Sequence, residues 1–268
     1  MLNKDTRVCI SLAGRPSDLG TRFQNRLYEE LGLDFLYEAF TTDDLEGAIR
    51  GVRALGIRGC SVSMPFKAAV LPLVDRVEAS AGGIGAANTI VNDDGVLTAS
   101  NTDVEAVRTL LEERDPDRGA PVVIRGSGSM ASAVSAAIAG LGFRDVTLVA
   151  RNRGAGEAIA TRDGHRFSDE PRAGAVLVNV TPLGMTGPDE HALAFDRDLV
   201  RAASLVVDVV ASPAETPLLR AAADAGVPSI GGADVHALQA GLQFERYTGV
   251  RLDRDRIEAA RDFARIPA

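Results

Sequence analysis

Aromatic residues and cysteines are scarce in this sequence. Aromatic side chains make up 4% of the 268 residues and tryptophan is absent, so the hydrophobic core is built mainly from Ala, Val, Leu and Ile. Such an aliphatic core suits a parallel sheet covered by helices. The two cysteines, Cys9 and Cys60, are too few for a disulfide framework and are not spaced as a metal site. We therefore expect no bound metal, and we expect Cys60 to be a buried structural thiol.

Long apolar runs and an excess of positive charge are also missing. No stretch approaches the roughly 18 consecutive apolar residues of a transmembrane helix, and the N-terminus carries no apolar run followed by a small-residue cleavage site. The 29 basic and 37 acidic residues give a net charge of -8, which is unsuited to binding nucleic acid or an anionic membrane. We expect a cytoplasmic protein, monomeric or homodimeric, whose partner is a small molecule.

Strand-like and helix-like segments alternate along the chain, as is typical of an α/β protein with a largely parallel sheet. Strands are predicted over residues 7–12, 34–40, 57–64, 121–125, 145–150, 175–180 and 205–210, with a short extended pair over 88–92 and 95–99. Helices are predicted over 22–31, 41–55 and 129–141, in pieces around 68–81, and twice after residue 233. Thr41 is the expected N-cap of the second helix.

A polar, breaker-rich stretch over residues 111–121 marks the expected junction between two domains. We expect an N-terminal α/β domain over residues 1–112 and a doubly wound, Rossmann-type domain over residues 113–235. The C-terminal helices, residues 236–268, have no strand between them, and we expect them to pack back on the first domain.

A glycine loop follows the predicted strand 121–125 and opens the predicted helix 129–141. Its six residues fit the G-x-G-x-x-G/A pattern of dinucleotide-binding folds: Gly126, Ser127, Gly128, Ser129, Met130 and Ala131. The first glycine makes the tight turn, the second lets backbone approach a pyrophosphate, and the third small residue allows the helix to pack closely on the strand. The helix N-terminus adds amide donors and a favourable dipole. The loop therefore predicts a dinucleotide site.

The next strand ends at Ala150, where an NAD-binding protein usually carries an acidic residue for the ribose hydroxyl. Here the chain continues as Arg151, Asn152 and Arg153. No carboxylate is present to repel a 2′-phosphate, and guanidinium groups bind phosphate well. This position therefore favours NADP as the cofactor.

The first domain holds candidates for acid–base chemistry. Lys67 lies one turn into a helix that is predicted to begin at Pro65, and Asn88 and Asp103 follow further along the chain. A lysine near an aspartate and an asparagine can exchange a proton with an alcohol during hydride transfer. The residues alone make these side chains candidates only.

Seven elements in order make the chain resemble the shikimate dehydrogenase family over nearly its whole length. The V-P-F-K, A-x-N-T and N-T-D elements of that family match Met64-Pro65-Phe66-Lys67, Ala86-Ala87-Asn88-Thr89 and Asn101-Thr102-Asp103. The glycine loop and the basic loop at Arg151 come next. The N-x-T-x-x-G-M element matches residues 179–185, the D-x-x-x-x-P-x-x-T-P-L-L run matches residues 208–219, and the late glutamine is Gln239.

The resemblance implies an N-terminal substrate domain, a C-terminal NADP domain and an active site in a cleft between them. It assigns acid–base catalysis to Lys67 and Asp103, and substrate binding to Thr21, Ser63, Asn88 and Gln239. It also implies cofactor contacts, besides the glycine and basic loops, for Asn179, Thr181, Met185 and Gly232. In such proteins the pathway is aromatic amino acid biosynthesis.

The segment that binds the substrate carboxylate departs from the family pattern. Leu19 and Thr21 stand where typical members have two serines, so one hydroxyl is lost, and a tyrosine that also binds the carboxylate is replaced by Ala211. Arg15 or Arg22 is a candidate to compensate, because guanidinium pairs naturally with carboxylate. The pattern is similar to the divergent, shikimate dehydrogenase-like branch.

These observations predict an NADP-dependent oxidoreductase that interconverts 3-dehydroshikimate, or a close cyclic polyhydroxy acid, with its alcohol. One alternative is a dehydrogenase for quinate or another hydroxylated ring acid. Another is an NADP(H)-binding protein with vestigial activity.

Overall fold

The computed structural model describes residues 2–266, and the chain divides into two compact units. The first unit takes the residues up to Thr102 together with those from Ala237 onward, and the second unit runs from Asp103 to His236. Each unit holds a six-stranded sheet with helices against it. The expected junction at residue 112 lies inside the second unit, because residues 102–114 form one uninterrupted helix. No helix in the described part of the chain is long and apolar enough to cross a membrane.

The sheet of the first unit is mixed. Its strands run in the order β2-β1-β3-β5-β6-β4. The first three are parallel, β5 is antiparallel to both of its neighbours, and β4 runs parallel to β6. The bounds of these strands are β1 (Arg7–Leu12), β2 (Phe35–Phe40), β3 (Gly59–Val62), β4 (Arg76–Val77), β5 (Thr89–Asp93) and β6 (Val96–Ser100).

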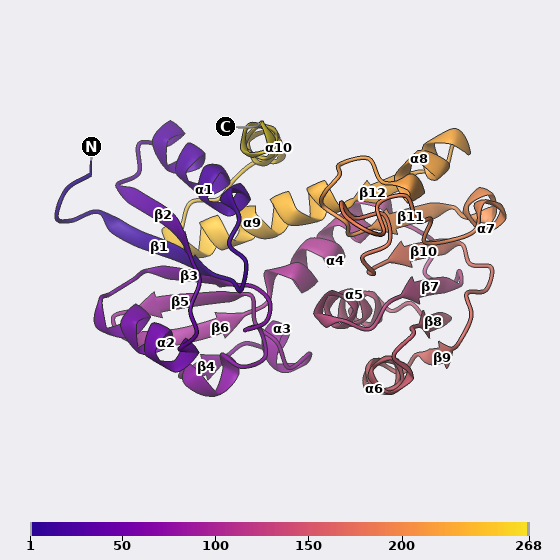
Figure 1. Ribbon diagram of the computed structural model, residues 1–268, viewed down its shortest axis with the longest axis horizontal. Helices are drawn as coiled ribbons and strands as arrows, with labels where there is room; N and C mark the ends of the chain where they lie inside the picture. Colours follow the sequence, from indigo (N-terminus) through magenta and orange to yellow (C-terminus); the bar gives the residue numbers. More distant parts are fainter. Residues whose placement is uncertain (1, 267–268) are drawn as a thin grey trace. The chain divides into compact units, whose positions relative to one another are not determined.

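Helices cover both faces of this sheet (Figure 1). On one face Ile49 and Val52 pack into an aliphatic core with Ile10 and Leu12 of β1. On the other, the Tyr28 ring lies 5.3 Å from the Phe244 ring. The helices of this unit are α1 (Asp18–Glu30), α2 (Leu45–Ala54), the short 3-10 turn η1 (Leu71–Leu73), α3 (Ala79–Gly82), α9 (Gly232–Thr248) and α10 (Arg254–Arg265).

The C-terminal helix α10 packs on α1. Arg256 of α10 pairs with Glu30 of α1, with 2.9 Å between Nε and Oε1. Arg22 and Arg26 of α1 both lie over the ring of Phe263, at 5.2 and 5.3 Å from its centroid. The last helix therefore belongs to the first unit, although more than 100 residues of the second unit separate the two in sequence.

The sheet of the second unit is parallel throughout and has the order β12-β11-β10-β7-β8-β9. This is the doubly wound order of dinucleotide-binding folds, with the first strand of the unit next to the crossover point. The four central strands consist mostly of Val, Leu and Ile, as expected when both faces are buried. Their bounds are β7 (Val122–Arg125), β8 (Val146–Val149), β9 (Arg166–Ser168), β10 (Val176–Asn179), β11 (Leu205–Asp208) and β12 (Ser229–Gly231).

Helices cover both faces of this sheet, with α5 and α6 on one face and α7 and α8 on the other (Figure 1). Small residues on α5 let it approach β7, and Ala131, the last residue of the glycine loop, is fully buried. Phe195, Val200 and Leu218 form a core against Val123 and Leu177 on the other face. The bounds are α4 (Thr102–Arg114), α5 (Ser129–Gly140), α6 (Arg153–Asp163), α7 (Arg197–Ala202) and α8 (Pro217–Asp224). The predicted α/β architecture with a Rossmann-type second unit is confirmed.

Two local predictions are wrong. The N-cap of α2 is Asp44, whose side chain accepts from the Gly47 amide at 2.8 Å, and not Thr41. Residues 65–70, predicted to begin a helix at Pro65, form turns, and the helical pieces predicted around residues 68–81 are limited to η1 and the single turn of α3. Phe66, Val70 and Leu73 pack in the core of the sheet, which overrides the helical spacing seen in the sequence.

We expect Gly59→Ala to destabilise the first unit. Gly59 lies in β3 under the Tyr247 ring, and a Cβ atom there would lie 2.3 Å from that ring. Forcing extra volume into a packed core costs about 1–3 kcal/mol, so the midpoint of urea unfolding should fall. Gly51→Ala in α2 is the matched control, because nothing lies within 4 Å of its added Cβ. An unchanged midpoint for Gly59→Ala would contradict this packing of α9 on β3.

Candidate functional site

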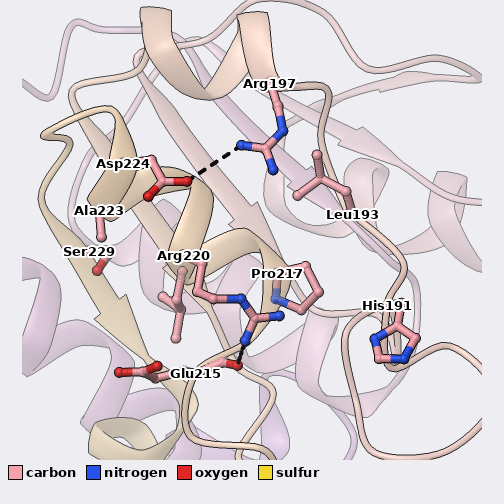
Figure 2. A pocket seen from close by; sticks show the side chains of 10 residues that line it. His191, Leu193, Arg197, Glu215, Pro217, Arg220, Ala223, Asp224 and Ser229 are labelled. Atoms are coloured by element: carbon pink, nitrogen blue, oxygen red, sulfur yellow. Dashed lines mark hydrogen bonds and ion pairs between the residues drawn. The ribbon is translucent and has the colours of Figure 1, made fainter.

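One pocket of the second unit, about 750 Å³, contains none of the predicted catalytic, substrate-binding or cofactor-binding residues (Figure 2). It lies along α8, and two of its arginines already have partners. Arg197 lies 3.6 Å from Asp224, and Arg220 donates to the backbone carbonyl of Glu215 at 2.6 Å. The candidate site is therefore built from the polar networks at the strand ends rather than from this pocket.

The segment that carries Lys67 is anchored at both of its ends. The Gly14 amide donates to the Met64 carbonyl at 2.8 Å, which ties the segment to the loop after β1. The Lys67 carbonyl accepts from the Ala87 amide at 2.8 Å. Lys67 is half-buried and Ser63, at the start of the segment, is exposed. The backbone of Lys67 is thus fixed beside the residue that precedes Asn88.

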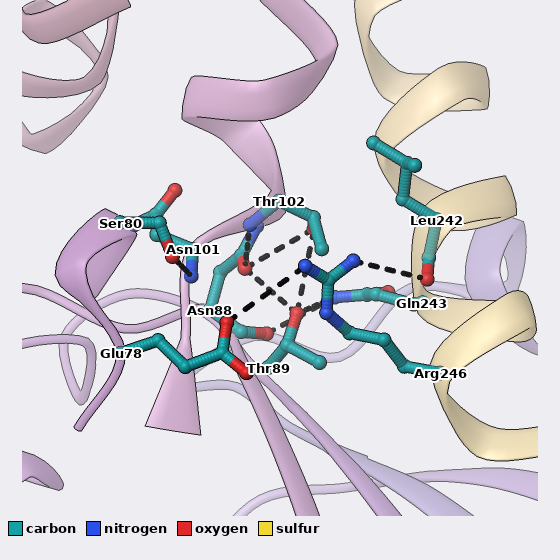
Figure 3. Close-up of polar contacts among 9 residues, drawn as sticks. All are labelled: Glu78, Ser80, Asn88, Thr89, Asn101, Thr102, Leu242, Gln243 and Arg246. Carbon is teal, nitrogen blue, oxygen red and sulfur yellow. Dashed lines mark hydrogen bonds and ion pairs between the residues drawn. The ribbon is translucent and has the colours of Figure 1, made fainter. Parts of the chain in front are cut away.

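Asn88 links the start of β5 to the start of α4 and to α9. Its Oδ1 accepts from the Thr102 amide and from the Thr89 hydroxyl, both at 2.8 Å (Figure 3). Its Nδ2 donates to Oε1 of Gln239 on α9 at 3.4 Å. Two predicted substrate-binding residues, Asn88 and Gln239, therefore lie side by side. Asp103, 8% exposed, is the next residue after Thr102 in the chain.

Gln243 is a site residue that the sequence analysis missed. It is 3% exposed, and its Nε2 donates to the Asn88 carbonyl at 3.0 Å and to the Thr89 hydroxyl at 3.1 Å (Figure 3). Gln243 follows Gln239 by four residues, so both side chains lie on one face of α9. That spacing is a signal in the sequence from which Gln243 could have been predicted.

Thr21 carries a polar group without a partner. Its hydroxyl oxygen is buried and makes no hydrogen bond with any residue in the described range 2–266. A buried hydroxyl without a partner costs free energy, which a bound ligand can recover. The role of Thr21 as a ligand contact stays a prediction.

The two arginines considered as substitutes for the lost hydroxyl differ in their surroundings. Arg22 donates to the Phe263 carbonyl at 3.2 Å and lies over the Phe263 ring, so its guanidinium faces α10. Arg15 is exposed, and within residues 2–266 it forms neither a hydrogen bond nor an ion pair through its side chain. It directly follows Gly14, which is bonded to the segment that leads to Lys67. Arg15 is thus the arginine that is free to bind an anion.

The glycine loop has the backbone that a pyrophosphate site needs. Gly126 has φ +134°, and a Cβ there would lie 2.8 Å from the Val180 side chain, so only glycine fits. Gly128 is exposed, and nothing lies within 4 Å of the position its Cβ would take. It is the N-cap of α5 and provides no side-chain cap, which leaves the first amides of that helix open to a ligand. The loop fits a dinucleotide.

The three residues of the basic loop after β8 differ in their contacts. Asn152 caps α6 by accepting from the Ala155 amide at 3.1 Å. Arg153 pairs with Glu157 at 2.8 Å and with Asp169 at 2.7 Å. Arg151 is exposed and forms no hydrogen bond or ion pair with the described residues. Of the two predicted phosphate-binding arginines, Arg151 is the available one.

Asn179 and Thr181, predicted cofactor contacts, form a buried network at the ends of β10 and β11. Asn179 Nδ2 donates to Asp208 at 2.9 Å, and its Oδ1 accepts from the Thr181 hydroxyl at 2.6 Å. Asp208 also accepts from Thr216, the N-cap of α8. Burial raises the pKa of the Asp208 carboxyl, against these hydrogen bonds. The network shapes the loop that begins at Thr181.

The remaining predicted residues differ in exposure. Met185 is 45% exposed. Gly232 is buried so tightly that a Cβ would lie 2.3 Å from the Val210 carbonyl. Both cysteines are buried, as predicted for Cys60, and burial raises the pKa of the Cys9 thiol to about 11. No group of three or more His, Cys, Asp or Glu side chains suited to a metal ion occurs within residues 2–266.

Comparison with known proteins relates both units to one family. The family described as "Shikimate dehydrogenase substrate binding domain" matches residues 19–90. A "Shikimate dehydrogenase-like protein" from Haemophilus influenzae is 49% identical over 268 residues, which cover 99% of each chain.

Solved structures agree along nearly the whole length. A shikimate 5-dehydrogenase from Thermus thermophilus, in complex with NADP(H) and shikimate, matches with a TM-score of 0.87 and 29% identity, covering 96% of this chain and 99% of that one. A quinate dehydrogenase from Corynebacterium glutamicum, in complex with NAD, matches with a TM-score of 0.86 and 27% identity, covering 96% and 98%.

We expect Gln243→Met to destabilise the first unit more than Gln239→Met does. The first change removes two buried hydrogen bonds at 3.0 and 3.1 Å, so the Asn88 carbonyl keeps only its bond from Val62 and the Thr89 hydroxyl keeps its bond to Asn88. Each lost hydrogen bond contributes about 0.5–1.5 kcal/mol. Gln239 is half-buried and its contacts are longer, at 3.4 Å. Thermal unfolding of the two variants measures the difference, and equal losses would count against the structural role of Gln243.

Proposed function

The chain belongs to the shikimate dehydrogenase family, and from this premise we propose that it is an NADP-dependent oxidoreductase that reversibly reduces 3-dehydroshikimate or a close cyclic polyhydroxy acid. The observation that carries the proposal is the cluster around Asn88. There an amide pair, Asn88 and Gln239, lies beside the fixed backbone of Lys67. Amide groups suit the hydroxyls of a ring substrate, and a lysine suits proton exchange at the reacting oxygen.

Lys67 is the proposed proton donor and acceptor, and Asp103 is proposed to orient it. Lys67 is one of only two lysines among the 29 basic residues, the other being Lys4. Arginine is always protonated in proteins, whereas a lysine amine can give up and regain its proton. In a chain that otherwise uses arginine for positive charge, this supports a proton-exchange role for residue 67.

The glycine loop and Arg151 are proposed to hold the dinucleotide, with Gly126 and Gly128 allowing its phosphates to approach the backbone. When bound, NADP supplies the hydride chemistry that no amino-acid side chain provides. The open amides at the N-terminus of α5 favour a negative charge there.

Arg15 is the proposed partner of the substrate carboxylate. It has no bonded partner within residues 2–266, whereas Arg22 is engaged with Phe263. Together with the Thr21 hydroxyl, one guanidinium would replace the two hydroxyls and the tyrosine found in typical members. Quinate and other hydroxylated ring acids carry the same carboxylate, so they are alternative substrates. An NADP(H)-binding protein with vestigial activity is the alternative from another class.

Steady-state oxidation of shikimate and of quinate, each with NADP and with NAD, tests the proposal through the absorbance of the reduced nicotinamide. We expect turnover with NADP, and we expect Lys67→Ala and Lys67→Arg both to lower kcat by roughly 10²–10⁴-fold while leaving cofactor affinity unchanged. Lys67→Arg keeps the charge but removes the exchangeable proton.

Lys4→Arg is the matched control, because Lys4 is exposed and pairs only with its neighbour Asp5 among the contacts of its side chain. Cofactor binding without turnover on any ring acid would favour the vestigial alternative. Full activity of Lys67→Arg would exclude proton exchange by this residue.

We expect Arg15→Gln to raise the KM for the ring acid by roughly ten- to a hundredfold, because a charge-assisted hydrogen bond contributes about 1.5–3 kcal/mol. Arg22→Gln should instead lower the thermal midpoint, since Arg22 holds α10 against α1. Kinetics with the acid, set beside calorimetry of each variant, separate the two arginines. A raised KM in Arg22→Gln with an unchanged one in Arg15→Gln would reverse the assignment.

A further inference from the structure

Strand β7 ends in an arginine immediately before the glycine loop. Arg125 is half-buried, and its Nη1 donates to the Ala194 carbonyl in the segment that leads to α7. Most strand positions in this sheet are aliphatic, so a half-buried cation at the end of β7 is unusual. In a doubly wound fold, ligands bind outside the carboxyl ends of the strands, which is where Arg125 lies.

Arg125 lies close to the basic loop. It is paired in register with Val149 of the neighbouring strand β8, and Arg151 follows Val149 by two residues. Burial lowers the pKa of the Arg125 guanidinium, Asp196 raises it, and the like charge of Arg151 lowers it further. The two guanidinium groups are thus near enough to repel each other, and an anion bound by both would relieve that repulsion.

Arg153 does not share this position. Its guanidinium is taken up by Glu157 and Asp169, and it lies over the Phe167 ring at 5.2 Å from the centroid. Using it for a ligand would require breaking both ion pairs. Arg151, in contrast, has no bonded partner within the described residues.

We infer that Arg125 and Arg151, rather than Arg153, bind the 2′-phosphate of NADP and set the preference for NADP over NAD. The inference rests on the proposed function, since it specifies which residues of the dinucleotide site read the phosphate. The end of the second strand of such a sheet is where the 2′ position of the adenosine ribose is recognised. Arg125 is therefore a specificity-determining residue at the end of the first strand of the unit.

Two carboxylates lie beside Arg125 in one hollow. Glu170 and Asp196 line, with Arg125 and Phe195, a small hollow of about 290 Å³. Asp196 offsets part of the positive charge, so Asp196→Asn should strengthen phosphate binding. The affinity for the phosphate should thus rise in Asp196→Asn and fall in Arg125→Gln. If Asp196 only supported the fold around Arg125, Asp196→Asn would not raise that affinity.

Calorimetric binding of adenosine 2′,5′-bisphosphate and adenosine 5′-monophosphate to the full chain tests the inference without any turnover. We expect Arg125→Gln to weaken the bisphosphate by roughly ten- to a hundredfold, as for loss of a charge-assisted hydrogen bond, and to leave the monophosphate unchanged. Arg125→Lys should keep part of the discrimination. Arg153→Gln is the matched control and should keep all of it.

Loss of discrimination in Arg153→Gln but not in Arg125→Gln would overturn the inference, and so would equal binding of the two nucleotides by the unmodified chain. If Arg125→Gln fails to fold, as a lowered thermal midpoint would reveal, then Arg125→Lys and Asp196→Asn decide: unchanged discrimination in both overturns it. Discrimination that depends on Arg125, in a chain without turnover on ring acids, would support the inference while rejecting the proposed reaction.

Discussion

The first unit depends on the requirement that Asn88, 2% exposed, have a partner for each of its polar groups. Its amide donates to Ser100 at the end of β6, and its carbonyl accepts from Val62 at the end of β3 and from Gln243 on α9. Each buried group left unsatisfied would cost about 1–3 kcal/mol, so these three elements are held in one arrangement. The Lys67 carbonyl, bonded to the preceding residue, Ala87, shares that rigidity. A fixed backbone at residue 67 supports the proton exchange proposed for its side chain, because catalytic groups must be held close to their productive geometry.

In the second unit the buried polar group that needs partners from several elements is a carboxylate. Asp208 is fully buried, and Asn179 and Thr216 satisfy its oxygens from β10 and from the first turn of α8. Because these residues lie at the carboxyl ends of neighbouring parallel strands, the network fixes the loops on the edge where a dinucleotide approaches. The glycine loop lies on that edge too, since Gly126 is packed directly against Val180, the residue after Asn179.

Elements that depend on local sequence patterns could be predicted from the sequence, whereas elements that depend on tertiary packing could not. The aliphatic strands and the glycine loop were predicted because their patterns are local. The turns over residues 65–70, where a helix was predicted, were not, since the packing of Val70 in the core of the sheet outweighs local helical spacing. The prediction for the start of α2 was wrong for a different reason. Thr41 and Asp44 are both good N-cap residues. The Asp44 amide donates to the Thr42 hydroxyl at 3.0 Å, a contact that favours Asp44 as the N-cap.

The arginines show most clearly what could not be predicted from the sequence. Position in the sequence favoured Arg151 and Arg153 equally as phosphate ligands, and Arg15 and Arg22 equally as carboxylate ligands. The structure separates each pair through partners that lie far along the chain: Asp169 is 16 residues from Arg153, and Phe263 is 241 residues from Arg22. An arginine that already contacts a carboxylate or an aromatic ring must give up that contact to bind a ligand, which reduces its net gain. An arginine without such a contact, placed where a ligand anion arrives, pays only for its own desolvation and ordering. The proton exchange proposed for residue 67 requires the opposite property, a cation that can lose its proton, and there the chain has one of its two lysines.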